Sequence, residues 1–141
     1  MTNIQIVADE DVIDQTFRSI SPFNLKNDFK THFGRDYTQE KKSLIQDLSL
    51  SINEPTGNSV KRMALGHLEI ENKMIYVVQV RMADQVSKKG KSGGFRCIVL
   101  LDKLINVGYL LHIFPKNKVD KIDEQERKKL NTLLVKYIYS K

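Results

Sequence analysis

The pattern of apolar residues changes near Val60, and this change constrains the fold more than any other feature of the chain. Before Val60, apolar side chains recur at helical spacing, as in the stripe formed by Leu44, Leu48 and Ile52. After Val60, short apolar runs are separated by turn residues, and apolar and polar residues alternate in the second half of I-Y-V-V-Q-V-R-M. Helices followed by strands predict an α+β protein.

The expected elements follow from these periodicities and from the turn residues between them. In the first part we expect a short strand at Ile4 to Val7, a helix from Asp11 to the Ser21-Pro22 break, a short helix ending near Gly34, a helix from Tyr37 to Leu50, and a turn at Asn53 to Asn58. In the second part we expect two hairpins, one pairing Leu68–Ile70 with Met74–Met82 and the other pairing Phe95–Leu101 with Val107–Phe114.

The final segment carries the clearest helix signal. Asp123 stands where a helix N-cap is expected, and Glu126 completes the spacing of a capping box. One apolar stripe follows, made by Leu130, Leu133, Leu134, Tyr137 and Ile138. The sequence therefore predicts a small antiparallel sheet of about four strands, packed by N-terminal helices and a C-terminal helix. We expect a single domain, 1–141, with an extended N-terminal helical part, 1–60.

Charge is divided unevenly along the chain. Residues 1–60 hold six Lys and Arg against nine Asp and Glu, while residues 61–141 hold seventeen against eight. The two parts therefore carry −3 and +9, which favours a polyanionic partner for the second part, although a merely solvated basic surface explains the same numbers. The lone Cys97 lies in the apolar run C-I-V-L-L, as a buried structural cysteine does. With no apolar run near the length of a membrane span and no secretory signal, the sequence predicts a cytoplasmic protein without membrane contact.

Lys88 to Arg96, K-K-G-K-S-G-G-F-R, is the segment that carries chemistry. Its four cations repel one another, a bound phosphate relieves that repulsion, and the interspersed glycines let backbone N–H groups approach an anion. The alternative is a solvated hairpin loop whose lysines serve solubility. A P-loop does not fit, because Gln85 stands where its first glycine belongs and a strand follows. The three histidines show no metal-ligand spacing, so no metal or other cofactor is expected.

The stretch from Ile75 to Tyr137 resembles the RelE/HigB-like toxins, of the RelE/ParE superfamily, found in bacterial type II toxin–antitoxin modules. The resemblance rests on a strand ending in V-R-M, then K-K-G-K-S-G-G-F-R, C-I-V-L-L, Y-L-L-H-I-F-P-K-N and D-K-I-D-E-Q-E-R-K-K-L, in that order. It implies a RelE-like fold and a metal-independent endoribonuclease, an mRNA interferase that inhibits translation by cutting mRNA, usually on the ribosome. It also implies a small DNA-binding antitoxin as partner.

The resemblance assigns roles to residues by position. Lys89, Lys91, Arg96 and Lys116 match the family's catalytic cations, and Arg81 matches the arginine of the preceding strand. In such a reaction the 2′-OH of RNA attacks phosphorus, so the protein must withdraw one proton, stabilise the phosphorane and protonate the leaving oxygen. Crowded like charges lower a lysine's pKa, so Lys89 or Lys91 is the expected proton carrier. We expect Arg96, Arg81 and Lys116 to hold phosphate oxygens. Lys88 is expected to bind substrate with them.

Phe114 departs from the family, because many relatives carry tyrosine there and phenylalanine transfers no proton. It is expected to stack on a base, and His112, on the same side of the strand, is a candidate substrate contact or a core histidine. The departure keeps a second hypothesis open, a catalytically silent protein of the same fold that binds RNA or a protein through its basic face. A third, a DNA-binding module, has the charge but no recognisable helix-turn-helix or zinc-finger signature.

Overall fold

The computed structural model describes residues 3–17, 20–65, 73–82, 95–115 and 122–140, and within them the chain is an α+β protein, as expected. Helices and strands follow one another in the order β1 (Gln5–Val7), α1 (Glu10–Phe17), α2 (Leu25–Phe33), α3 (Thr38–Asn53), β2 (Val60–Arg62), β3 (Ile75–Arg81), β4 (Phe95–Asp102), β5 (Val107–Pro115) and α4 (Glu124–Tyr139).

The sheet differs from the expected one in strand number and direction. Its described strands are five, in the order β1-β5-β4-β3-β2, and β1 runs parallel to β5 while the other pairs are antiparallel. The parallel pair is possible because three helices lie between β1 and the rest of the sheet in sequence, long enough for a crossover. The expected strand at Leu68–Ile70 lies outside the described residues.

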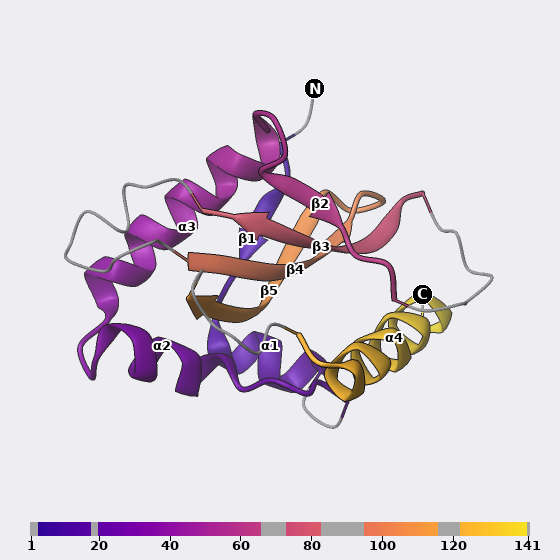
Figure 1. Ribbon diagram of the computed structural model, residues 1–141, viewed down its shortest axis with the longest axis horizontal. Helices are drawn as coiled ribbons and strands as arrows, with labels where there is room; N and C mark the ends of the chain where they lie inside the picture. The colour runs from indigo at the N-terminus through magenta and orange to yellow at the C-terminus, as the bar shows by residue number, and fades with distance from the viewer. Residues whose placement is uncertain (1–2, 18–19, 66–72, 83–94, 116–121, 141) are drawn as a thin grey trace.

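Helices cover the sheet on both faces (Figure 1). α3 lies against one face, while α1 and α4 lie against the other. On the latter face Phe17 of α1 and Tyr137 of α4 meet Tyr109 of β5 edge to face, with ring centroids 5.4 and 5.8 Å apart. The core is continuous between the layers, and its largest fully buried side chains come from helices and strands alike.

α4 begins and packs as its sequence predicts. The Asp123 carboxylate accepts a hydrogen bond from the Glu126 backbone, and the Glu126 carboxylate accepts one from the Asp123 backbone, which completes the capping box. One turn from the other end, the Tyr137 hydroxyl donates to the fully buried Asp102 carboxylate at 2.6 Å. Burial and this bond raise the pKa of Tyr137. α4 is therefore fixed to the strands at its C-terminal half.

A polar clasp joins α1 to α3. The Glu10 carboxylate accepts hydrogen bonds from the Tyr37 hydroxyl and the Lys41 ammonium, each at 2.7 Å. Partial burial opposes the charged form of Glu10, but the bonds from Lys41 and Tyr37 outweigh it and lower the pKa of the carboxyl. The bond to Glu10, with burial second, raises the pKa of Tyr37 to about 12.

Two further expectations concern single residues. Cys97 is fully buried, and burial raises the pKa of its thiol, which fits a structural cysteine. Gly34 follows α2 with a φ of +90°, where the sequence predicts that helix to end. In the described part of the chain no helix combines the length and the apolar character needed to cross a membrane.

Candidate nucleic-acid interface

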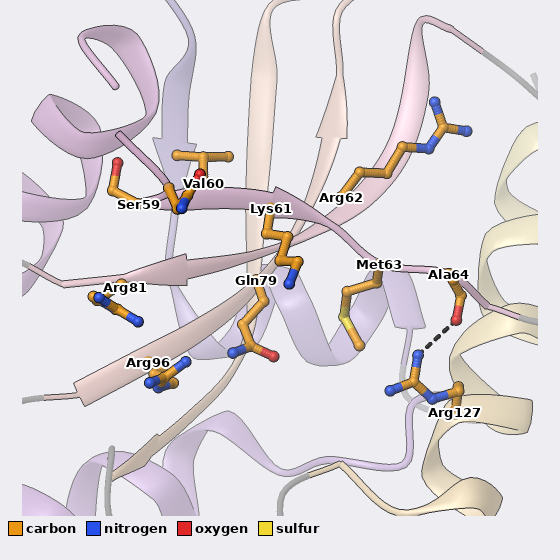
Figure 2. A pocket seen from close by; sticks show the side chains of 11 residues that line it. Ser59, Val60, Lys61, Arg62, Met63, Ala64, Gln79, Arg81, Arg96 and Arg127 are labelled. Atoms are coloured by element: carbon orange, nitrogen blue, oxygen red, sulfur yellow. Dashed lines mark hydrogen bonds between the residues drawn. The ribbon is translucent and has the colours of Figure 1, made fainter. Parts of the chain in front are cut away.

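A hollow of about 570 Å³, which we call the basic groove, lies on the sheet face beside α4 (Figure 2). It is built by β2 with the residues before and after it, by the facing ends of β3 and β4, and by the first turn of α4. Its lining residues are Asn58, Ser59, Val60, Lys61, Arg62, Met63, Ala64, Gln79, Arg81, Arg96 and Arg127. Among these described residues no side chain is acidic.

Arg81 and Arg96 stand directly opposite each other on β3 and β4. The next pair, Met82 and Phe95, is hydrogen-bonded across the strands at 3.0 Å, and the Arg81 N–H donates instead to the carbonyl of Ser59, just before β2, at 2.7 Å. Pairs alternate in an antiparallel ladder, so the two arginines occupy a non-hydrogen-bonded pair, in which Cα atoms are only ~4.5 Å apart and side chains are closest. Like charges in that position destabilise a sheet.

Arg96 is the less solvated of the two arginines. Arg81 is exposed, whereas Arg96 is half-buried, and the buried Nε of Arg96 has no hydrogen-bond partner among the described residues. A guanidinium nitrogen that has lost water without gaining a partner is costly. A phosphate oxygen is a ligand that removes this cost, because a guanidinium binds phosphate through two parallel N–H groups.

The groove continues from the arginines along the sheet. Lys61 of β2 and Gln79 of β3 form the neighbouring cross-strand pair on the same face, because Gln79 and Arg81 are two residues apart. Figure 2 shows both side chains directed into the hollow, whereas Arg62 points away from it. Arg62 lies over the Tyr76 ring instead, 4.7 Å from its centroid. Because side chains alternate along a strand, the two cations of β2 lie on opposite faces of the sheet.

Arg127 closes the groove on the side of α4. Its Nη1 donates a hydrogen bond to the Ala64 carbonyl at 2.6 Å, which ties the first turn of α4 to the residues after β2 (Figure 2). The remaining N–H groups of a guanidinium tied in this way can still donate to an anion. Four cations, Lys61, Arg81, Arg96 and Arg127, therefore surround one hollow without a carboxylate among the described lining residues.

The basic groove contrasts with a second hollow of about 380 Å³ between α1 and the chain that leads into α2. That hollow is lined by Glu10, Asp11 and Asp14, with Lys26 as the basic residue among its described members. Its negative charge repels a polyanion. The distribution of charge between the two hollows identifies the basic groove as the better anion site.

Of the predicted site residues, the structure brings Arg81 and Arg96 together. Lys88, Lys89 and Lys91 belong to the connection between β3 and β4 and lie outside the described residues, as does Lys116. That connection starts and ends at the strand ends that carry Arg81 and Arg96.

His112 and Phe114 lie in the interior, 8% and 2% exposed, so their positions do not support the expected contact with a bound base. Both face the same side as Arg96, which pairs with Phe114 across β4 and β5. Their rings stack on one another with centroids 5.5 Å apart, and Phe23 stacks on His112 at 4.0 Å. The alternative of a core histidine describes His112 better, because its Nδ1 meets the Asp28 carboxylate at 2.7 Å.

Asp28 and His32 of α2 complete the backbone pairing of β5. β1 pairs with Val107, Gly108 and Tyr109, so the later part of β5 has an edge that no strand of the described residues covers. Ile113 donates its N–H to the Asp28 carboxylate at 3.2 Å, and its carbonyl lies 3.1 Å from His32 Nε2. Side chains of α2 thus satisfy the backbone groups that a further strand would otherwise pair.

Sequence reasoning missed Lys61 and Gln79 as groove residues. Gln79 has a signal, since period two places it beside Arg81, but a lone glutamine in a strand suggests nothing further. Lys61 had no such signal in the sequence, because a strand of three residues with two cations cannot be distinguished from a loop. Arg127 is recognisable only as part of the basic face of the last helix.

Groups of three or more His, Cys, Asp or Glu side chains arranged to hold a metal ion do not occur among the described residues. The described side chains of the basic groove offer positively charged hydrogen-bond donors, from Lys61, Arg81, Arg96 and Arg127. In the comparisons with known proteins, the chain matches no family model, no curated protein and no solved structure.

Proposed function

We propose that the protein binds RNA in the basic groove and cleaves it without a metal, as the toxin of a toxin–antitoxin module acting on mRNA at the ribosome. The observation that carries the binding step is the Arg81–Arg96 pair. Two cations held face to face, one of them with an unpartnered buried nitrogen, are stabilised by a shared anion. RNA supplies such anions at regular intervals, and the +9 charge of residues 61–141 attracts it.

The cleavage step assigns separate roles to the arginines and the lysines. Arg81 and Arg96 hold non-bridging phosphate oxygens and stabilise the charge that develops on them as the 2′-OH attacks. They do not transfer protons, because an arginine side chain stays protonated in proteins. Lys89 or Lys91 is the proposed proton carrier, while Lys116 holds a phosphate oxygen with the arginines, and this part of the proposal rests on the resemblance to the RelE/HigB-like toxins.

The alternative is a protein that binds RNA, or a protein partner, through the same groove without cleaving. It is favoured by the interior position of His112, whose imidazole contacts Asp28, and by Phe114, which has no proton to transfer.

The test combines expression in a bacterial host with assays of the purified protein. The proposal predicts growth arrest, cleavage of mRNA in cells, and binding of single-stranded RNA that persists with EDTA present. Arg96→Gln should weaken binding and cleavage together, whereas Lys89→Ala and Lys91→Ala should lower cleavage more than binding. Binding without growth arrest or cleavage establishes the alternative. A protein that binds no RNA, with or without ribosomes, contradicts the proposal and leaves only the protein partner of the alternative.

The proposed antitoxin is tested separately. We expect a neighbouring reading frame to encode a small DNA-binding protein whose co-expression restores growth. Rescue must be accompanied by a complex of the two chains, since a protein that restores growth without binding this chain is no antitoxin. A neighbouring frame that neither restores growth nor binds removes this partner from the proposal.

A further inference from the structure

Gln79 differs chemically from the cationic residues of the basic groove. Its amide is neutral, it lies at the centre of the described lining, and the cationic side chains of Lys61, Arg81 and Arg96 surround it (Figure 2). Charged residues there suit phosphates, which are the same in every nucleotide. A neutral amide suits a base edge, which differs between nucleotides.

The surroundings of Gln79 hold its side chain in place. It is half-buried, it pairs with Lys61 on one neighbouring strand and with the buried Ile98 on the other, and all three share a face. A central position in a sheet fixes the Cα–Cβ direction more firmly than a loop does. The amide itself makes no hydrogen bond to the described residues.

The apolar part of the groove lies beside that amide. Met63 lines the hollow next to Gln79, and its thioether side chain points toward the interior of the groove in Figure 2. A methionine side chain adapts to a flat ring and makes favourable contacts with it. An amide beside a thioether offers a base both a hydrogen-bonding edge and an apolar contact.

From this geometry we propose that Gln79 is a specificity-determining residue that reads the base of the nucleotide bound between the arginine pair and Arg127. The inference rests on the proposed function, since it presumes RNA in the groove. A glutamine amide accepts from N6 and donates to N7 of adenine at the same time, so the preferred base is adenine. RNA presents that edge only when the base is unstacked, so the substrate is single-stranded.

The experiment uses short oligomers of adenine, uracil and cytosine nucleotides with 2′-O-methyl groups, which cannot supply the attacking hydroxyl. Binding to the full chain is measured by fluorescence anisotropy. Wild type should bind the adenine oligomer about 5- to 100-fold more tightly than the others, the range that one good bidentate contact provides. Gln79→Leu should bring the three affinities within about twofold, because the adenine oligomer loses its bidentate contact.

Gln79→Glu sharpens the test, because a carboxylate only accepts and therefore favours the N4 amino group of cytosine. It should weaken all binding and move the preference from adenine to cytosine. Gln46→Leu, at an exposed position in the middle of α3, is the matched control and should behave as wild type. Circular dichroism confirms that each variant is folded.

The outcomes separate the inference from the proposed function. Wild-type binding without base preference, or a preference that survives Gln79→Leu, overturns the role of Gln79 and leaves RNA binding intact. A wild-type protein that binds none of the oligomers, even at low salt, overturns the proposed function and the inference with it. A loss of preference in Gln46→Leu also overturns the inference, because the effect is then not local to the groove.

Discussion

Replacing Arg81 by glutamine should stabilise the free protein and weaken its binding to RNA. The two effects have one cause. Arg81 faces Arg96 in a close, non-hydrogen-bonded pair, and a like-charge pair opposite in a sheet costs about 0.2–1 kcal/mol. Removing one charge recovers that free energy, which for a chain of this size raises the melting temperature by about 1–4 °C. Most substitutions have the opposite sign.

Binding should fall for the same reason. A hydrogen bond from a charged donor contributes about 1.5–3 kcal/mol, so Arg81→Gln should raise the Kd for single-stranded RNA about 10-fold or more. Each phosphate neutralised on a single strand adds about −0.7 to the slope of log K against log salt concentration. If Lys61, Arg81, Arg96 and Arg127 each neutralise one phosphate, they contribute about −2.8, and Arg81→Gln removes about a quarter of it.

The assay pairs calorimetry or thermal denaturation with anisotropy titrations at several salt concentrations. Arg35→Gln is the matched control, since Arg35 is exposed between α2 and α3 and the substitution removes the same charge. It should leave the Kd and the salt slope as in wild type. An Arg81→Gln protein that melts at a lower temperature, or that keeps the wild-type salt slope, refutes the assignment of the pair as an anion site.

Three further predictions concern side chains that are not among the lining residues of the basic groove. The pKa of Tyr37, raised from 10.0 to about 12, contributes stability that is complete below pH 10 and is lost as pH rises through 12. Denaturant titrations of Tyr37→Phe should therefore show a smaller loss of unfolding free energy between about pH 10 and 12 than those of wild type. At acid pH the lowered pKa of Glu10 contributes stability that is present above pH 4.5 and is lost as pH falls. A wild-type plot of unfolding free energy against pH that is flat at both the acid and the alkaline end contradicts the clasp. Tyr137→Phe should lower the unfolding free energy by about 1–3 kcal/mol, because it leaves the buried Asp102 carboxylate without that donor; a loss below about 0.5 kcal/mol argues against the bond. Phe114→Tyr should cost about 1–3 kcal/mol by placing a hydroxyl in the interior and should not increase RNA cleavage, so a gain in cleavage would show that the side chain faces the substrate.

Local patterns in the sequence predict the helices and most of the strands. The capping box at Asp123, the stripe of Leu44 and Leu48, and the alternation around Gln79 each depend on neighbours within one or two turns or one strand. These patterns therefore also predict which face carries Arg81. The segment of β3 begins and ends within a residue of its expected bounds.

Pairing across long distances was not predictable from the same patterns. The parallel register of Gln5 with Val107 joins residues far apart in the chain, and neither strand signals its partner. The edge of β5 is completed by Asp28 and His32, whose positions on α2 look like an ordinary polar helix face. The groove depends on the same kind of information, because Lys61 enters it only through the pairing of β2 with β3.

The interior position of Phe114 changes how its difference from the tyrosine of many RelE/HigB-like toxins bears on the proposed function. At the surface, a phenylalanine in place of tyrosine would mean the loss of a proton donor, which weighs against catalysis. In the structure it pairs with Arg96 on the same face and is itself buried, so it replaces water beside that arginine. A charge with less water around it interacts more strongly with an opposite charge. In the proposed complex Arg96 therefore gains more from a phosphate than the exposed Arg81 does, and Phe114, which gives no proton, strengthens the cation that holds the reacting group.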